Sequence, residues 1–269
     1  MHAHPDDEAL LSAGTLATLA AAGHRVVLVL ATQGEVGAVG DDVLAVDEGL
    51  GERRAAEAQA SAAAIGVERL VFLGFGDSGS DAPGPAGWPA GSLCAANLDV
   101  VVDGLAAVIA DERPDLVIAD DRNGGYGHPD HVRVHEAATL AAARCGVAVV
   151  EVTIDRDFLA GGIALAQGMG ITVPEGFVPP DVSHWYTAGA DITHAVDVSA
   201  ALGAKRASME AHASQATGAP DTVRTLAVFL GLPDDLFALA FGTEWFVWPD
   251  RPTSPRGTDL LADLPTPAS

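Results

Sequence analysis

Two short motifs contain side chains that can bind a metal ion and activate water. The first is the run HPDDE, in which His4 and Asp7 are three residues apart and a proline restricts the turn between them. Imidazole nitrogen and carboxylate oxygen are ordinary zinc ligands, and a catalytic zinc site keeps three protein ligands and one open position. His4 and Asp7 are therefore candidate ligands of one ion. Asp6 would stand beside that ion, where a general base for water is needed.

The second motif lies in residues 123–131 and ends in the run GHPDH. His128 and His131 are again three residues apart, with proline in the second position. This segment can supply a third metal ligand, while its other histidine faces the substrate. Taken singly, the first motif is explained about as well by acidic residues that cap a helix. For the second motif, two surface histidines in a polar loop are the less favoured explanation, because histidine is the commonest metal ligand. Together they indicate a site with two histidines and one carboxylate.

Strands and helices alternate around these motifs and must position them. Short apolar runs with β-branched residues predict buried strands at 25–32, 69–73, 115–119 and 147–154. Segments rich in alanine, leucine, glutamate and arginine predict helices at 8–22, 52–65, 97–110 and 131–144. This alternation predicts an α/β fold, a three-layer Rossmann-like sandwich with a mostly parallel sheet. Sites in such folds lie beyond the carboxyl ends of the strands, and we place both motifs there.

The pattern becomes less regular after residue 155. We expect residues 1–155 to form the catalytic core and residues 156–248 to form a smaller mixed extension that completes the same domain. Within the extension, glycines and prolines between 161 and 180 predict an irregular connection. It is followed by a strand at 192–198 and helices at 199–213 and 221–230. Residues 249–269 are rich in proline, aspartate and threonine, which predicts a disordered tail.

Composition limits the classes of function. The chain has 269 residues, of which 49% are hydrophobic, enough for a substantial core. Its 37 acidic and 14 basic residues give a formal charge of −23, which disfavours nucleic acid and anionic membranes as partners. The two cysteines, Cys94 and Cys145, form no disulfide or metal motif, and apolar stretches are too short to span a bilayer. We expect a cytoplasmic protein with a small-molecule substrate, and the sequence leaves a homo-oligomer open.

The chain resembles the LmbE/PIG-L family of zinc-dependent N-acetylglucosaminyl deacetylases, in particular its actinobacterial mycothiol-type deacetylases and amidases. The strongest matches are AHPDDE at 3–8 and GHPDH at 127–131. Weaker matches occur in family order, and they are TQGEVG at 32–37, RxxE at 54–57, DSG at 77–79, KR at 205–206 and AHASQ at 211–215. The resemblance covers residues 3 to about 150 well and the remainder less closely.

This resemblance implies a metal centre and a base. Zinc, with iron(II) as the alternative metal, would be held by His4, Asp7 and His131. Asp6 would act as the general base. Family members carry a full apolar strand before the first motif, whereas here only residues 1–3 precede His4. We therefore expect either that the true start lies upstream or that the chain begins inside that strand.

The resemblance also implies roles for residues around the metal. His128 would stabilise the oxyanion or protonate the leaving amine, and Asp130 would orient it. Tyr126 would assist near the tetrahedral intermediate. Arg54 and Asp77 would contact the sugar or a polar group beside it.

The function that these residues predict is metal-dependent hydrolysis of an N-acetyl amide on an amino sugar or glycoconjugate. Three alternatives remain at this point. The same site suits an amidase that cleaves a larger amide of a thiol or sugar conjugate. A metal- or sugar-binding protein without turnover would not need Asp6. A nucleotide-binding protein is disfavoured because the glycines at 34, 37 and 40 do not form the dinucleotide-binding pattern.

Overall fold

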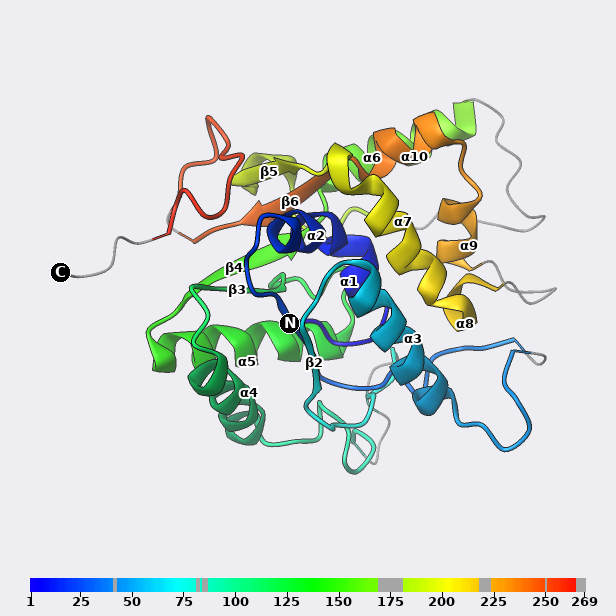
Figure 1. Ribbon diagram of the computed structural model, residues 1–269, viewed down its shortest axis with the longest axis vertical. Coiled ribbons are helices and arrows are strands. Elements are labelled where there is room, and N and C mark those ends of the chain that lie inside the picture. The colour runs from blue at the N-terminus through cyan, green and yellow to red at the C-terminus, as the bar shows by residue number, and fades with distance from the viewer. Residues whose placement is uncertain are drawn as a thin grey trace.

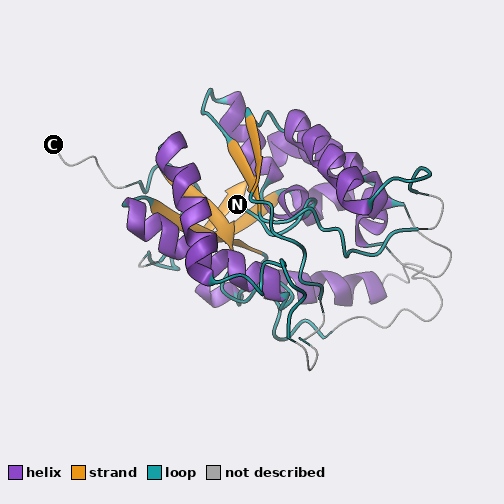
Figure 2. Ribbon diagram, turned by 90° about the horizontal axis from the view of Figure 1, so that it is seen from below, coloured by secondary structure: helices purple, strands orange, loops and turns teal. Residues whose placement is uncertain are grey.

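The computed structural model describes residues 1–40, 43–80, 83, 87–168, 181–217, 224–249 and 251–264. Helices lie on both sides of a central group of strands, which confirms the predicted α/β sandwich (Figures 1 and 2). The strands are β1 (Val27–Leu30), β2 (Arg69–Phe72), β3 (Leu116–Asp120), β4 (Ala148–Thr153), β5 (His194–Asp197) and β6 (Thr243–Val247). The helices of the first 155 residues are α1 (Asp7–Leu11), α2 (Ala13–Ala21), α3 (Leu50–Ala64), α4 (Leu98–Glu112) and α5 (Pro129–Cys145).

The strands form two hydrogen-bonded groups joined by the first residues of the chain. β1 pairs with β2 and β3 pairs with β4, both in parallel, as the sequence predicts. Between the two groups, the His2 amide donates to the Val29 carbonyl at 2.9 Å, and the amino group of Met1 donates to the Ile118 carbonyl at 2.5 Å. Residues 1–3 therefore lie between β1 and β3, and they place His4 at the carboxyl edge of the sheet.

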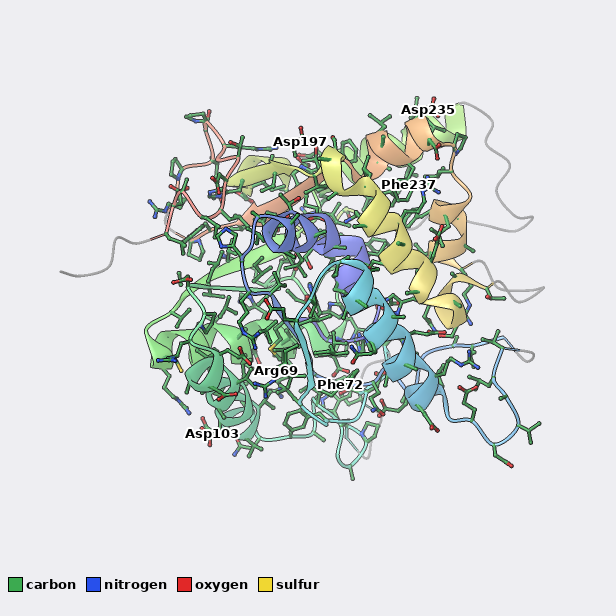
Figure 3. All side chains as sticks on the ribbon, viewed as in Figure 1. Arg69, Phe72, Asp103, Asp197, Asp235 and Phe237 are labelled. Carbon is green, nitrogen blue, oxygen red and sulfur yellow. The ribbon has the colours of Figure 1, made fainter. Side chains whose placement is uncertain are left out.

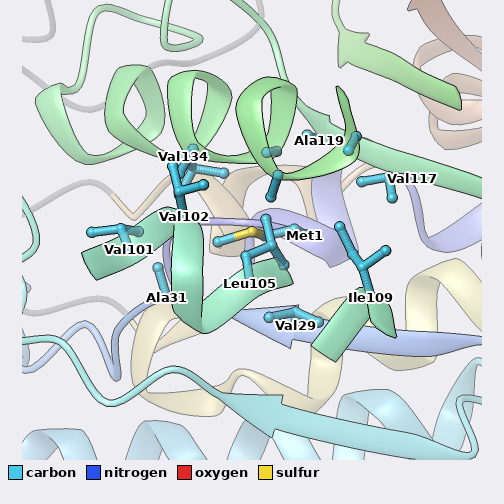
Figure 4. Packing of buried hydrophobic residues seen from close by; sticks show 14 of the residues in the cluster. Met1, Val29, Ala31, Val101, Val102, Leu105, Ile109, Val117, Ala119 and Val134 are labelled. Carbon is cyan, nitrogen blue, oxygen red and sulfur yellow. The ribbon is translucent and has the colours of Figure 1, made fainter. Parts of the chain in front are cut away.

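Alternation along the strands explains why helices cover both faces. Successive side chains of a strand point to opposite faces of its sheet. Val29 and Ala31 pack in the largest apolar cluster with residues of α4 and α5 (Figure 4). Leu28 and Leu30 point the other way and pack against α3. Apolar side chains of β1 therefore pack against helices on both of its faces.

Later elements extend the sheet beyond β4 and add helices beside α1, α2 and α3. They are the helices α6 (Arg156–Gly168), α7 (Leu202–Ala211), α8 (Ala213–Ala216), α9 (Thr225–Leu230) and α10 (Asp234–Phe241), and the 3₁₀ turns η1 (Gly189–Asp191) and η2 (Ser199–Ala201). β6 lies antiparallel between β4 and β5. Phe237 of α10 is buried, whereas acidic residues such as Asp103, Asp197 and Asp235 lie outside (Figure 3). A buried ion pair of 2.6 Å between Lys205 and Glu244 joins α7 to β6.

Three segments differ from the expectations drawn from the sequence. The helix expected at 8–22 breaks at Ser12, whose non-helical φ of −134° separates α1 from α2. The irregular connection expected from residue 161 is helical as far as Gly168, because Asp155 accepts hydrogen bonds from the amides of Asp157 and Phe158 at its start. The rest of that connection, residues 169–180, lies outside the described residues.

The third difference concerns the expected tail. Residues 251–264 contact the body of the protein: Leu260 is buried, and Asp263 lies 2.8 Å from the Nε2 atom of His194 on β5. The composition of the segment did not reveal this partner, because His194 lies more than fifty residues earlier in the chain. Residues 265–269 are not among those described. In the described part of the chain, no helix combines the length and apolar character needed to cross a membrane.

Candidate metal centre and active site

Two loops meet beyond the carboxyl ends of β1 and β3, as the sequence predicts. We call them the N-terminal loop (residues 4–8, which include the first two residues of α1) and the glycine-rich loop (residues 123–131, which include the first three residues of α5). The rings of His4, His128 and His131 have centroids 4.7 to 5.4 Å apart. The Asp7 Oδ2 atom lies 3.6 Å from His4 Nδ1 and 3.4 Å from His131 Nε2. The three predicted ligands therefore share one buried cluster.

The chemistry of this cluster fits a metal ion. His131 is 3% exposed, and neither of its ring nitrogens makes a hydrogen bond to the described residues: Nε2 faces Asp7 and Nδ1 faces Asp120. A buried polar nitrogen without a partner is costly. His4, Asp7 and His131 offer two nitrogens and one carboxylate, the donor set of a catalytic zinc site. These residues would satisfy the unpaired Nε2 atom of His131 by holding a cation.

Asp120 supports His131 from behind and was not predicted. Its Oδ2 atom lies 3.0 Å from His131 Nδ1, and its Oδ1 atom lies 2.7 Å from Nδ1 of His2. Burial alone would raise the pKa of Asp120, but His131 and His2 outweigh that effect and hold it well below its usual range. A carboxylate behind a ligating histidine fixes its ring orientation and tautomer. The sequence feature that could have indicated this role is the position of Asp120 at the carboxyl end of a strand, β3.

Asp6 stands at the edge of the cluster in an unusual backbone conformation. Its φ is 100°, in the left-handed region that a residue with a side chain seldom adopts. Its Oδ1 atom accepts a hydrogen bond from Nη2 of Arg54 at 3.1 Å. Burial raises the pKa of Asp6 above its usual range, Arg54 opposes that shift, and Asp7 adds to it. A carboxylate with a raised pKa beside the ligands is suited to accept a proton from water.

Arg54 has a different environment from the one expected for a sugar contact. It is 4% exposed, and its guanidinium donates to the carbonyl oxygens of Gly34 and Pro5 as well as to Asp6. A Cβ atom on Gly34 would overlap Nη1 of Arg54, so the glycine leaves room for the guanidinium. The structure therefore places Arg54 behind Asp6, where it orients the carboxylate.

His128 caps helix α5 and is neutral. Its Nδ1 atom accepts a hydrogen bond from the amide of Asp130 at 3.1 Å. Because an amide can only donate, the ring proton must reside on Nε2. Burial lowers the pKa of His128 to about 4, and the neighbouring His4 and His131 add to the effect. His128 can thus offer an Nε2–H donor to a developing negative charge.

The Asp130 carboxylate does not contact the ring of His128, contrary to the expectation that it orients that residue. It accepts hydrogen bonds from the Ser78 amide at 2.9 Å and from Cys94 Sγ at 3.2 Å. It also lies 3.3 Å from Nε2 of His4. Asp130 therefore orients His128 through its backbone amide and supports His4 through its carboxylate.

The remaining predicted residues flank the cluster. Tyr126 is 46% exposed, and its ring centroid lies 5.9 Å from those of His128 and His131. Asp77 is buried, accepts a hydrogen bond from the Gly79 amide, and lies 3.6 Å from Nε2 of His4. Tyr126 is thus accessible from solvent beside the histidines. Asp77 is buried and lies near Nε2 of His4, whereas Asp7 lies near Nδ1 of the same ring.

Comparison with known proteins extends these observations. Residues 1–142 match the family described as PIG-L, GlcNAc-PI de-N-acetylase. The chain is 36% identical over 287 residues to the 1D-myo-inositol 2-acetamido-2-deoxy-alpha-D-glucopyranoside deacetylase of Mycolicibacterium smegmatis, with 98% of this chain and 95% of the relative covered.

Two solved structures share the fold at low sequence identity. One is the N,N'-diacetylchitobiose deacetylase of Pyrococcus horikoshii, with TM-score 0.56, 22% identity, and 92% of this chain and 80% of that chain covered. The other is the 4-carboxy-2-hydroxymuconate hydratase GalB of Pseudomonas putida, with TM-score 0.57, 16% identity and 96% of both chains covered. Because these two enzymes differ in reaction, the fold alone does not fix the chemistry.

Proposed function

The chain belongs to the PIG-L family of GlcNAc-PI de-N-acetylases, and from that premise we propose that it hydrolyses the N-acetyl amide of an amino sugar. The observation that carries the proposal is the pairing of two functions in one cluster. His4, Asp7 and His131 form a donor set for a cation, and Asp6 stands beside them with its own support from Arg54. A protein that only bound metal or sugar would have no use for the constrained Asp6.

We propose zinc as the metal, held by His4, Asp7 and His131, with iron(II) as the alternative. When bound, zinc supplies Lewis acidity, which polarises the acyl carbonyl and makes water more acidic. Asp6 takes a proton from the attacking water as the new carbon–oxygen bond forms. The Nε2–H group of His128 donates to the developing oxyanion. When the carbon–nitrogen bond breaks, the proton held by Asp6 passes to the amine, and the products are acetate and a free amino sugar.

We propose a neutral amino sugar as the substrate class. The chain carries a formal charge of −23, and the site holds the carboxylates of Asp6, Asp7 and Asp77. Arg54 is committed to Asp6 and two backbone carbonyls and so is not available to a phosphate. A substrate with several phosphates would meet repulsion that a neutral glycoside does not. The inositol glycoside named for the mycolicibacterial relative is of this neutral class.

Release of the free amine from three compounds tests the proposal. The compounds are 1D-myo-inositol 2-acetamido-2-deoxy-α-D-glucopyranoside, a thiol conjugate of the amino sugar joined by a larger amide, and UDP-N-acetylglucosamine. The expected order of kcat/KM places the neutral acetamido glycoside first, and a chelator should abolish its turnover. Preference for the larger amide would indicate an amidase, and preference for the diphosphate would overturn the proposed substrate class. Metal analysis of the purified protein distinguishes zinc from iron.

A further inference from the structure

A buried polar cluster lies behind Asp6. It consists of Glu8 on α1, Ser61 on α3 and His212 at the end of α7. Glu8 and His212 are each completely buried, and the Glu8 Oε1 atom lies 2.6 Å from both His212 Nε2 and Ser61 Oγ. Ser61 Oγ also lies 2.7 Å from the hydroxyl of Ser208 on α7. Segments more than two hundred residues apart therefore meet at one carboxylate.

The other oxygen of that carboxylate holds the backbone of Asp6. The Asp6 amide donates to Glu8 Oε2 at 3.1 Å. A left-handed backbone is strained for a residue with a Cβ atom, so the surrounding contacts must maintain it. Arg54 holds the side chain of Asp6 and the preceding carbonyl, and Glu8 holds its amide. Two charged groups thus fix both the carboxylate and the backbone of the same residue.

The ring of His212 makes a hydrogen bond that fixes Glu8. Its Nε2 atom contacts Glu8, while its buried Nδ1 atom has no partner among the described residues. Two residues further on, Ser214 donates from its amide and its hydroxyl to Glu57 of α3, at 2.8 and 2.6 Å. Residues 212–214 therefore make two sets of hydrogen bonds with the N-terminal half of the chain. The bond from His212 is the one connected to Asp6, through Glu8. A leucine in its place would fill the space without orienting the carboxylate.

We propose that His212 is a positioning residue for the deacetylation reaction, which acts through Glu8 to hold Asp6 in its left-handed conformation. His212 does not itself face the substrate, because it is fully buried. This inference rests on the proposed function, since it gives His212 a part in the reaction that Asp6 performs. It also assigns the C-terminal extension a part in the reaction, although the three proposed metal ligands and Asp6 all come from the first 131 residues.

Steady-state kinetics on two substitutions test the proposal. His212→Leu removes the donor to Glu8, and His212→Gln keeps an amide donor at a similar reach. We expect His212→Leu to lower kcat about 10²-fold, the size of effect expected from a misplaced catalytic group. KM and metal content should stay within about twofold of the wild type, because a buried positioning residue touches neither substrate nor metal. His212→Gln should recover most of kcat.

A double-mutant cycle with Asp6→Asn separates positioning from general structural damage. If His212 acts through Asp6, adding His212→Leu to Asp6→Asn should lower kcat no further. An additive loss in the double variant, or a loss of kcat no larger than the loss of folded protein, would overturn the proposal. Should His212→Leu fail to fold, Ser61→Ala removes the other side-chain donor to Glu8 and should lower kcat about tenfold, within the range seen for misplaced groups. An unchanged kcat in Ser61→Ala together with an inactive His212→Gln would count against it.

Crystal structures of the wild type and of His212→Gln and His212→Leu give a readout that does not depend on turnover. The Asp6 φ should stay near 100° in the first two and leave the left-handed region in the third. If the wild type released no acetate but this shift occurred, the proposed function would fail while the positioning contact would stand. If the wild type were active and Asp6 kept its conformation in all three proteins, the positioning role would be wrong.

Discussion

The tripeptide His-Pro-Asp occurs once in each loop of the site, with different outcomes. In the N-terminal loop, His4 lies beside the Asp7 carboxylate and Asp6 adopts a left-handed backbone. In the glycine-rich loop, His128 is the N-cap of α5 and Asp130 lies within the first turn of that helix. The Asp6 side chain is 20% exposed, whereas that of Asp130 is completely buried. Identical local sequence thus yields one carboxylate that can meet water and one that cannot.

The difference arises from the helix attached to each tripeptide. Pro129 begins α5, a helix of 17 residues, so the backbone after His128 is helical at once. After Pro5 comes the five-residue helix α1, whose start is constrained by Glu8 and Arg54 rather than by a long helix. The role of a motif residue therefore depends on the element to which the motif is attached. Substitutions of equivalent residues in the two loops test whether their roles differ in this way.

The largest contrast should lie between the two histidines of the glycine-rich loop. His131→Ala should lose the metal and reduce activity to background, because the buried Nε2 atom of His131 faces Asp7 and has no hydrogen-bond partner among the described residues. His128→Asn keeps a side chain suited to cap the helix, and it should retain the metal while kcat falls about 10²–10³-fold through loss of an oxyanion donor. Metal analysis and kcat on both proteins make the measurement. Full metal occupancy in His131→Ala would remove it from the ligand set.

The next largest difference is expected between substitutions of Asp6 and Asp130, the two aspartates of the repeated tripeptide. Asp6→Asn should keep the metal and lower kcat by ~10²–10⁴-fold, the contribution of general acid–base catalysis. Asp130→Asn should instead weaken metal binding, since its carboxylate supports His4. Kinetics and metal titration of the two variants test the contrast. If Asp6→Asn strips the metal while Asp7→Asn keeps it, the roles of Asp6 and Asp7 have been exchanged.

A smaller effect is expected behind His131. Asp120→Asn should lower metal affinity about 10–100-fold, as loss of a carboxylate behind a ligating histidine does, while saturating metal restores most of kcat. Competition with a chelator of known affinity measures the change. Arg122→Gln, two residues further along the chain, removes the pair with Glu151 and is the matched control, which should leave the affinity unchanged. Equal affinities for Asp120→Asn and the control would contradict the supporting role.

The smallest effect concerns how each loop is held from behind. The glycine-rich loop follows the five-residue strand β3, whereas the N-terminal loop follows residues 1–3 beside a cavity of about 250 Å³ lined by Met1, Leu28 and Val117 among others. An added N-terminal extension of four apolar, β-branched residues should enter this space and pair with β1 and β3. We expect it to stabilise the protein by about 1–2 kcal/mol, a rise in Tm of a few degrees, and to strengthen metal binding.

A glycine–serine extension of the same length is the control for that prediction. It can form the same backbone hydrogen bonds but buries little apolar surface. Calorimetry and metal titration of both extended proteins give the result. If the two extensions changed Tm and metal affinity equally, burial of apolar side chains in the cavity would not be the cause of the stabilisation of His4.

Much of the fold was predictable because its signals are local. Short apolar runs, separated by alanine-rich segments, predicted all four N-terminal strands and the helices between them. The rule that sites lie at carboxyl ends of strands then brought the two motifs together in the prediction, and the family resemblance selected His131 as the third ligand. The structure places His4, Asp7 and His131 in one cluster. The break at Ser12, helix α6 and the contacts of residues 251–264 were missed, because each depends on a cap or partner that composition does not reveal.

The sequence by itself therefore determined the donor atoms of this protein, the spacing that lets them meet, and the edge of the sheet where they gather. Only the tertiary structure decided which partner each donor acquires: Arg54 for Asp6, Asp120 for His131, His212 for Glu8. The last of these pairs joins residues 204 positions apart. Short spacings are fixed by backbone geometry, which the chain carries locally, whereas such distant pairs form only when separate elements are packed together and burial makes an unpaired charge too costly.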